Sequence, residues 1–174
     1  MNETIGRLDQ LVSTLATWGD FKTAWSPAAA LVDAKLQADV TALLETYPFL
    51  ASDEGYVEFL RRYGGAILVR ADALVLSLYG FSHDIGMHIV EGPGEPLDDG
   101  ALILCDMVVP RTIRARTDPR ETVATVAVGF GFEATGERRA GIYRFVDGGK
   151  AAWYCETFLD WLAAVVARDG QVSD

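Results

Sequence analysis

Apolar residues in the first third of the chain recur every three or four positions, which is the period of an amphipathic helix. This spacing predicts helices over residues 5–18, 27–47 and 53–63. The second helix is expected to stop at Pro48, because the residue before a proline avoids the helical conformation. The one-sided apolar face of the third helix holds Tyr56, Phe59, Leu60 and Tyr63.

After Gly65 the apolar pattern shortens to that of β-strands. Short runs rich in apolar and β-branched residues predict strands over residues 66–70, 73–79, 102–109, 122–132, 142–146 and 151–154. Residues 80–100 contain five glycines and two prolines and are predicted to form a loop. A closing helix is predicted over residues 157–168, where apolar positions again fall on one face.

This order of elements predicts an α+β fold. Its parts are N-terminal helices, a mainly antiparallel sheet of about six strands, and a C-terminal helix packed on the sheet. Residues 26–170 are expected to form the main domain, and residues 1–25 an N-terminal helical addition.

Composition narrows the function classes. Half of the 174 residues are hydrophobic, which excludes disorder as the main state. The chain has 25 acidic and 15 basic residues and a net charge of -10, so a nucleic-acid partner is not expected. The first residues do not resemble a signal peptide and no apolar run approaches the length of a membrane span, so we expect a cytoplasmic protein without membrane contact.

The acidic residues are unevenly distributed. Residues 71–110 contain seven acids and no lysine or arginine. Such a stretch either keeps a protein soluble or forms a binding face for a basic partner. On the second interpretation, the partner-binding candidates are Asp84, Glu91, Glu95, Asp98 and Asp99. Asp106 lies inside an apolar strand and is a candidate internal hydrogen-bonding carboxylate. The arginines of residues 111–120 are expected in a solvated loop.

Candidate catalytic chemistry is sparse. His83, Asp84 and His88 could bind a metal, but their spacing matches no known ligand motif. Cys105 and Cys155 lie in apolar runs and are expected to be buried, unreactive thiols. A charged turn is predicted around Glu133 and Glu137. The sequence therefore predicts no catalytic residue, no metal and no cofactor, with a small metal-dependent enzyme using His83 and His88 as a less favoured alternative.

Several short motifs together resemble the SUKH superfamily, the Smi/Knr-like domain. They cover about residues 28–168. The motif residues are Pro48, Phe59, Gly64, Gly65, Phe158 and Trp161. These residues belong to three motifs. The first is a proline followed by a short aromatic helix with Phe-Leu, the second is a Tyr-Gly-Gly turn that enters a strand, and the third is a Thr-Phe-Leu-Asp-Trp-Leu segment that opens the last helix. The Asp147-Gly148-Gly149 turn between the closing strands also fits the resemblance.

The resemblance implies a function without catalysis. Bacterial members of this superfamily are immunity proteins, which bind and neutralise a cognate toxin, often a nuclease or a deaminase, in the cytoplasm. The expected partner is therefore a toxin with a basic face, bound by occlusion. The alternative is a regulatory scaffold or small-ligand-binding protein that uses the bare strand face of Ala127, Gly129 and Gly131 as a pocket floor. The oligomeric state is left open.

Overall fold

The structure is a computed structural model that describes residues 2–81, 83–85, 88–90, 96–97, 100–114, 121–146 and 151–172. Of residues 83–85, 88–90, 112–114, 121–123 and 146 it describes the backbone alone. The helices are α1 (Glu3–Leu15), α2 (Pro27–Val32), α3 (Ala34–Thr46), the 3-10 helix η1 (Pro48–Ser52), α4 (Glu54–Tyr63) and α5 (Phe158–Ala167). The strands are β1 (Asp20–Thr23), β2 (Ala66–Val69), β3 (Val75–Leu78), β4 (His83–Ile85), β5 (His88–Val90), β6 (Ala101–Arg114), β7 (Glu121–Glu133), β8 (Ile142–Val146) and β9 (Ala152–Cys155).

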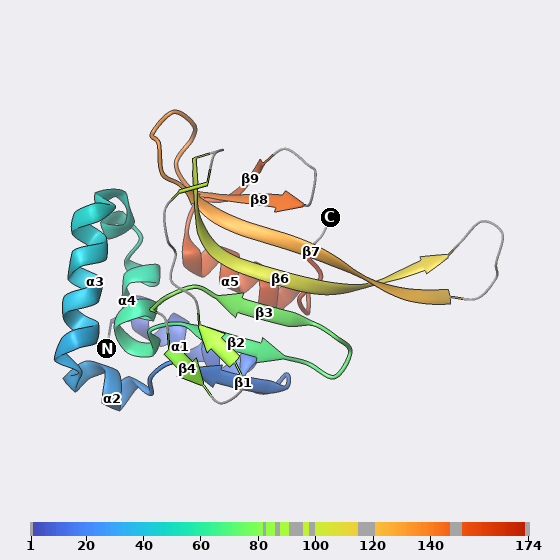
Figure 1. Cartoon of the computed structure of the whole chain (residues 1–174), viewed down its shortest axis with the longest axis horizontal. Helices are drawn as coiled ribbons and strands as arrows, with labels where there is room; N and C mark the ends of the chain where they lie inside the picture. The colour runs from blue at the N-terminus through green and yellow to red at the C-terminus, as the bar shows by residue number, and fades with distance from the viewer. Residues whose placement is uncertain are drawn as a thin grey trace.

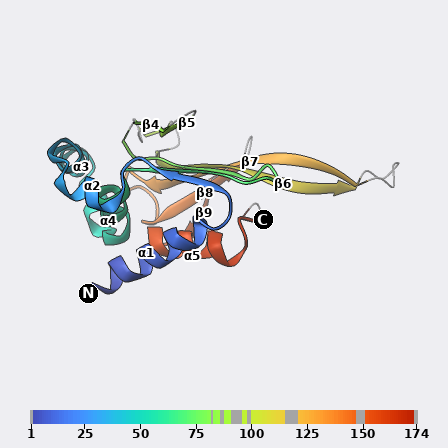
Figure 2. The ribbon, with the colours of Figure 1, turned by 90° about the horizontal axis from the view of Figure 1, so that it is seen from below.

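Seven strands form one antiparallel sheet in the order β1-β2-β3-β6-β7-β8-β9, and β4 pairs with β5 in a second, two-stranded sheet. The predicted α+β fold is therefore confirmed, with one more strand in the main sheet than expected. Figure 1 shows α2, α3 and α4 gathered at one end of the sheet. Figure 2 shows α1 and α5 against one face, called here the inner face, and β4 and β5 over the opposite, outer face.

The core lies between the inner face and the helices. The bulky side chains of β7 point inward, and Phe130 meets Trp161 of α5 with ring centroids 5.5 Å apart. Tyr56 of α4 lies 4.9 Å from Phe132 in the same way. All four side chains are almost fully buried. Burial of this much aromatic surface is the main force that holds the helices on the sheet.

The prediction for the second helix is refined. The single helix expected over residues 27–47 is split at Asp33, which ends α2 and caps α3 by accepting a hydrogen bond from the Leu36 amide at 2.9 Å. An aspartate in this position favours a cap over a continuous helix, because its carboxylate satisfies an amide that has no partner within the helix. Trp25 fixes the break by donating its indole N–H to the same carboxylate at 3.1 Å.

Three strands lie where none was predicted. β1 pairs with β2 at the sheet edge, so the helical addition expected over residues 1–25 also supplies a strand. β4 and β5 lie within the predicted loop of residues 80–100. Asp20–Thr23 contains a single large apolar residue, so its sequence shows little of the pattern of a strand. Its extended conformation comes from pairing with β2.

β6 and β7 are longer than predicted and extend beyond the rest of the sheet. β3 pairs with β6 only over Cys105–Val108, and β8 pairs with β7 only over Val128–Phe132. Residues 110–114 and 121–125 continue as a two-stranded ribbon, called here the arm, which projects away from the helices (Figure 1). Arg111 and Arg114 therefore belong to a strand, which corrects the expected loop, and Arg116 and Arg120 lie outside the described residues.

The residues that carry the SUKH resemblance have structural positions. Pro48 opens η1, and Gly64 closes α4 in a left-handed conformation with φ of 70°. A Cβ on Gly64 would lie 2.2 Å from the ring of Trp25, so both the conformation and the space require glycine. Gly65 leads into β2. Phe59, Phe158 and Trp161 are fully buried, and the expected turn of Asp147, Gly148 and Gly149 lies outside the described residues.

Candidate functional site

Only one of the five predicted partner-binding residues lies in the described part of the chain. Asp84 is the central residue of β4, where it pairs in register with Ile89 of β5. The other four lie outside the described residues: Glu91, Glu95, Asp98 and Asp99. Since β4 and β5 lie over the outer face and β5 contacts β2, the strand with Asp84 belongs to the same side of the molecule as the outer face (Figure 2).

Asp106 stands in the middle of this outer face. It pairs in register with Ser77 of β3 and with Gly129 of β7, so small residues flank it on both sides. Its carboxylate is exposed and accepts a hydrogen bond of 2.7 Å from the hydroxyl of Tyr79. The prediction of an internal carboxylate is thus wrong about burial, because Asp106 points away from α5 while Cys105 and Met107 beside it point into the core.

Apolar residues lie near Asp106 on the outer face, together with Ser77 and Tyr79. Val75, Val108 and Ala127 follow one another across the outer face and remain at least partly exposed. Phe145 of β8 lies over Gly129, where a Cβ would come within 2.1 Å of its ring. The outer face therefore places an exposed carboxylate beside partly exposed apolar side chains, a combination that occurs where a protein interface has an apolar centre and a polar rim.

On the bare strand face of β7, neighbouring strands cover Gly129 and Gly131, while Ala127 is exposed. Phe145 occupies the space beside Gly129, and the backbone of Leu102 lies 2.8 Å from a Cβ built on Gly131. The last helix packs on the opposite side of β7, against Phe130. The bare strand face is thus neither a seat for α5 nor part of the cavity described below.

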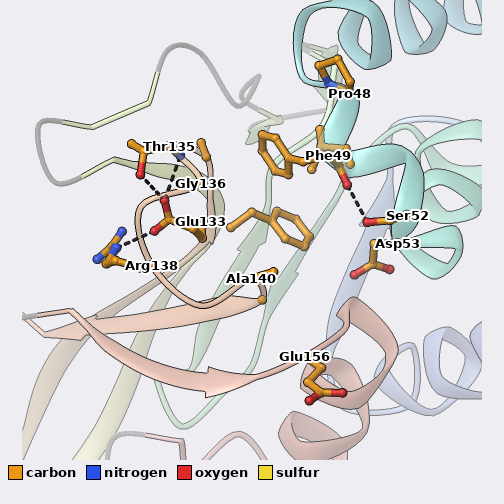
Figure 3. A pocket seen from close by; sticks show the side chains of 14 residues that line it. Pro48, Phe49, Ser52, Asp53, Glu133, Thr135, Gly136, Arg138, Ala140 and Glu156 are labelled. Atoms are coloured by element: carbon orange, nitrogen blue, oxygen red, sulfur yellow. Dashed lines mark hydrogen bonds and ion pairs between the residues drawn. The ribbon is translucent and has the colours of Figure 1, made fainter.

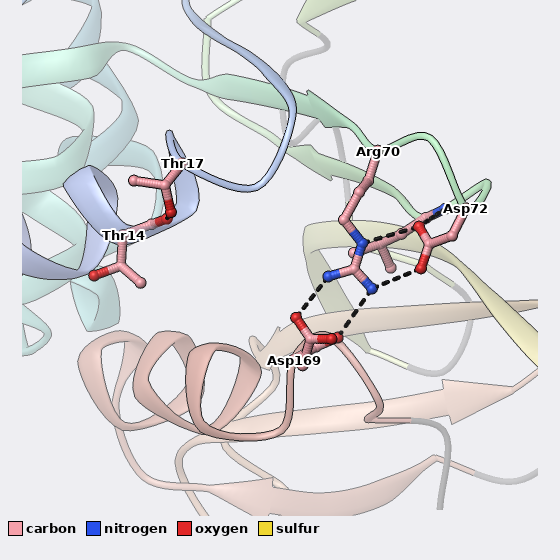
Figure 4. Close-up of polar contacts among 6 residues, drawn as sticks. Thr14, Thr17, Arg70, Asp72 and Asp169 are labelled. Atoms are coloured by element: carbon pink, nitrogen blue, oxygen red, sulfur yellow. Dashed lines mark hydrogen bonds and ion pairs between the residues drawn. The ribbon is translucent and has the colours of Figure 1, made fainter.

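Asp72 is one of the seven acids of residues 71–110, and it has a structural partner. Arg70 donates to both carboxylate oxygens of Asp72 at 2.9 and 2.8 Å and to the carboxylate of Asp169 at 2.6 Å (Figure 4). The guanidinium also lies over the ring of Trp18. Arg70 therefore neutralises Asp72 and ties the turn after β2 to the end of α5, which leaves Asp72 a structural role.

A cavity of about 430 Å³ opens between η1, the turn after β7 and the segment that joins β9 to α5 (Figure 3). Phe49 and Phe132 form an aromatic wall, and the polar lining residues include Asp53, Glu133, Arg138 and Glu156. A cavity of this size with an apolar wall and few polar groups is suited to a small ligand.

One polar end of the cavity is a buried ion pair. The side chain of Glu133 is 2% exposed and accepts hydrogen bonds from the amide and hydroxyl of Thr135 and from the guanidinium of Arg138. Burial raises the pKa of Glu133, but these donors outweigh it, and the net pKa lies below the ordinary value. The sequence predicted a solvated turn at Glu133 and Glu137. Glu133 is buried, so the prediction is wrong for this residue, whereas Glu137 is exposed.

Asp53 joins the N-terminal ends of two helices. One carboxylate oxygen accepts from the Tyr56 amide of α4 at 3.1 Å, and the other accepts from the Phe158 amide of α5 at 2.7 Å. The residue is 9% exposed, and burial raises its pKa although the two amides oppose the shift. With both oxygens engaged by backbone amides, Asp53 is a structural anchor of the cavity wall.

The remaining chemical candidates do not converge. The β4–β5 pairing places His88 opposite Ile85 and His83 opposite Val90, so the two histidines are not direct partners across the strands. Cys105 is buried and Cys155 half-buried, both are free, and burial raises the pKa of Cys155 to about 12. Among the residues that the structure describes, no three His, Cys, Asp or Glu side chains are arranged to hold a metal ion.

Within the described residues, none of the helices is both long and apolar enough to cross a membrane. Comparison with known proteins adds no relative: no family model, no curated protein and no solved structure matches this chain.

Proposed function

We propose that this chain is a non-enzymatic binding protein of the SUKH type, an immunity protein that neutralises a cognate bacterial toxin in the cytoplasm by covering its active site. The single observation that carries the proposal is the outer face, where the exposed Asp106 lies near the partly exposed side chains of Val75, Val108 and Phe145. The strand that contains Asp84 lies on the same side (Figure 2). A toxin that cleaves or modifies nucleic acid needs a basic cleft for phosphate, and a carboxylate on an apolar face suits such a cleft.

The motif residues support the SUKH type through their positions. The aromatic helix α4 ends at Gly64 and passes directly into β2, and Phe158 and Trp161 anchor α5 on the sheet. This is the helix, turn, strand and closing helix that the resemblance implies. The motif residues lie in the core and the turns, so they serve the fold, while the partner is recognised by side chains elsewhere.

The test is a binding measurement with the toxin candidate encoded next to this chain. Micromolar or tighter binding is expected, with an association rate that falls as salt rises. Asp106→Lys and Asp84→Lys are expected to weaken the affinity at least about tenfold, because each puts a cation against a basic partner. Glu3→Lys is the matched control, since Glu3 is exposed on α1, on the inner side of the sheet.

Two outcomes would contradict the proposal at different levels. If no neighbouring toxin candidate binds at micromolar concentration, the function is wrong. If a toxin binds and both outer-face variants bind it as well as Glu3→Lys does, the function stands and the outer face is the wrong surface.

The cavity favours a second candidate function, a small-ligand-binding protein. Its aromatic wall suits a ligand with an apolar body. Ala140 lines the cavity and is exposed, so Ala140→Leu should narrow it without disturbing the core. A compound that raises the melting temperature of the wild type and not of Ala140→Leu would support this function, and a library without any such compound would argue against it.

A further inference from the structure

The arm is a two-stranded ribbon whose described strands pair only with each other. Pro110 lies opposite Thr125 and Arg114 opposite Glu121, and the neighbouring strands β3 and β8 end before this region. Both ribbon views show it leaving the layer of helices and sheet (Figures 1 and 2). An isolated two-stranded ribbon is at best marginally stable in water, because half of its backbone groups along each edge lack a strand partner.

The two edges of the arm differ in their fitness to accept another strand. The β6 edge contains Pro110, which lacks an N–H, together with Arg111 and Arg114. Proline and charge on an edge are the features by which proteins prevent strand addition. The β7 edge from Thr122 to Ala127 has no proline, glycine or charge, and four of its six residues are β-branched. This composition favours an added strand.

The sequence of the β7 edge is complementary to itself. When two copies of Thr-Val-Ala-Thr-Val run antiparallel about a two-fold axis at Ala124, Thr122 meets Val126 and Val123 meets Thr125. Ala124 meets Ala124 of the second copy. Every opposed pair then joins residues of similar shape, as an isologous interface requires.

Charge is also compatible with pairing through the arm. Residues 110–125 contain four arginines against Asp118 and Glu121, a net charge of +2. Since the whole chain has a net charge of -10, the remaining residues carry -12. Contact between two arms keeps the acidic bodies apart. In a β6-β7-β7-β6 sheet the two arginine-bearing strands lie about 14 Å apart, beyond the Debye length of about 8 Å in physiological salt.

We propose that two copies of this chain dimerise through the arm, with the β7 edges paired antiparallel about Ala124 into a four-stranded sheet. The occupant of this edge is a second copy of the chain rather than a strand of another protein. The inference stands apart from the proposed function, since it needs no toxin.

The mass of the purified full chain in solution tests the proposal. Light scattering after gel filtration, from about 1 to about 200 µM, spans moderate to weak association. The expected mass is twice 18.9 kDa at the upper concentrations. Ala124→Lys and Ala124→Glu each place two like charges opposite one another at the axis and should give monomers, whereas an equal mixture of the two should recover the dimer. Circular dichroism establishes that each variant is folded.

Thr112→Glu is the matched control, because it adds a charge to the β6 edge of the same arm and should leave the dimer intact. A wild type that stays at 18.9 kDa throughout the range would overturn the proposal. So would a mixture of folded Ala124→Lys and Ala124→Glu that remains monomeric, or a Thr112→Glu variant that dissociates as readily as they do. Wild-type monomers that bind a strand of another protein at this edge would assign the arm to a foreign partner instead.

Discussion

Replacement of Asp53 should cost more stability than loss of a single helix cap, because one carboxylate serves both α4 and the Phe158 amide of α5, which is 105 positions away from Asp53 in the sequence. In Asp53→Ala, α4 loses its N-cap, which costs about 1 kcal/mol. The Phe158 amide at the start of α5 also loses its acceptor, and a buried N–H without a partner costs about 1–3 kcal/mol. The two losses together lower the free energy of unfolding by about 2–4 kcal/mol, a large part of the 5–15 kcal/mol typical of a domain.

A second variant separates the two losses. Asparagine caps helices as well as aspartate does, so Asp53→Asn keeps the α4 cap through its amide oxygen. The NH₂ group of the asparagine, however, would face the N–H of Phe158, and two donors cannot form a hydrogen bond with each other. Asp53→Asn should therefore lose about 1–3 kcal/mol, and the alanine variant about 1 kcal/mol more.

Urea denaturation followed by far-ultraviolet circular dichroism measures both variants. Ser52→Ala is the control, since the exposed Ser52 hydroxyl donates only to the Phe49 carbonyl, and its effect should stay within about 0.5 kcal/mol. The reasoning is refuted if Asp53→Asn is as stable as the wild type, because the bond to α5 would then contribute nothing. If both Asp53 variants lose no more free energy of unfolding than Ser52→Ala does, Asp53 does not anchor either helix.

Three further predictions test separate features. The pKa of Glu133 is lower in the folded chain than in the unfolded chain, so its contribution to the free energy of unfolding is complete above about pH 4.5 and disappears as the pH falls through the folded pKa. Glu133→Gln should lower the free energy of unfolding by about 1–2 kcal/mol at pH 7. In denaturation curves, the variant should also show a weaker dependence of this free energy on pH between about 3 and 5. Gly64→Ala should cost at least about 2 kcal/mol by urea denaturation, since the left-handed backbone and the Trp25 ring both oppose a Cβ, and a loss below about 0.5 kcal/mol would contradict this. Cys155, with a pKa of about 12, should react with a thiol reagent at pH 8 roughly a thousandfold more slowly than free cysteine, and a rate near that of the unfolded chain would contradict its burial.

The sequence predicted those elements whose residues fall in a local periodic pattern. α1, α4 and α5 each have an apolar stripe that the core requires, and the alternation along β7 correctly separated its inner and outer faces. β1 was missed because four residues with one large apolar side chain, Phe21, look like a loop until β2 supplies a partner. The break at Asp33 was missed because a cap and a helix interior share the same apolar spacing.

The candidate site was less predictable, because it depends on contacts between distant segments. The cavity joins η1 to the turn after β7, more than 80 residues later, and such a meeting has no signature in either segment. Glu133 was assigned to a solvated turn since its neighbours are charged, yet Arg138 and Thr135 make its burial possible. For Asp106, strand alternation alone would have indicated an outward position, because Cys105 and Met107 on either side face the core.

The contact between the first and last helices determines when folding can finish. α1 lies against α5, and Arg7 pairs with Asp160 at 3.1 Å across the two helices. Leu8 and Leu15 of α1 are fully buried, and α1 packs against both α4 and α5, so a chain that is still being synthesised cannot complete the packing around α1 before residues 158–167 emerge. At about 5–20 residues per second, the part of α1 that contacts α5 lacks this partner for roughly 7–30 s. We therefore expect the nascent chain to depend on chaperones, and a chain truncated before Phe158 to aggregate.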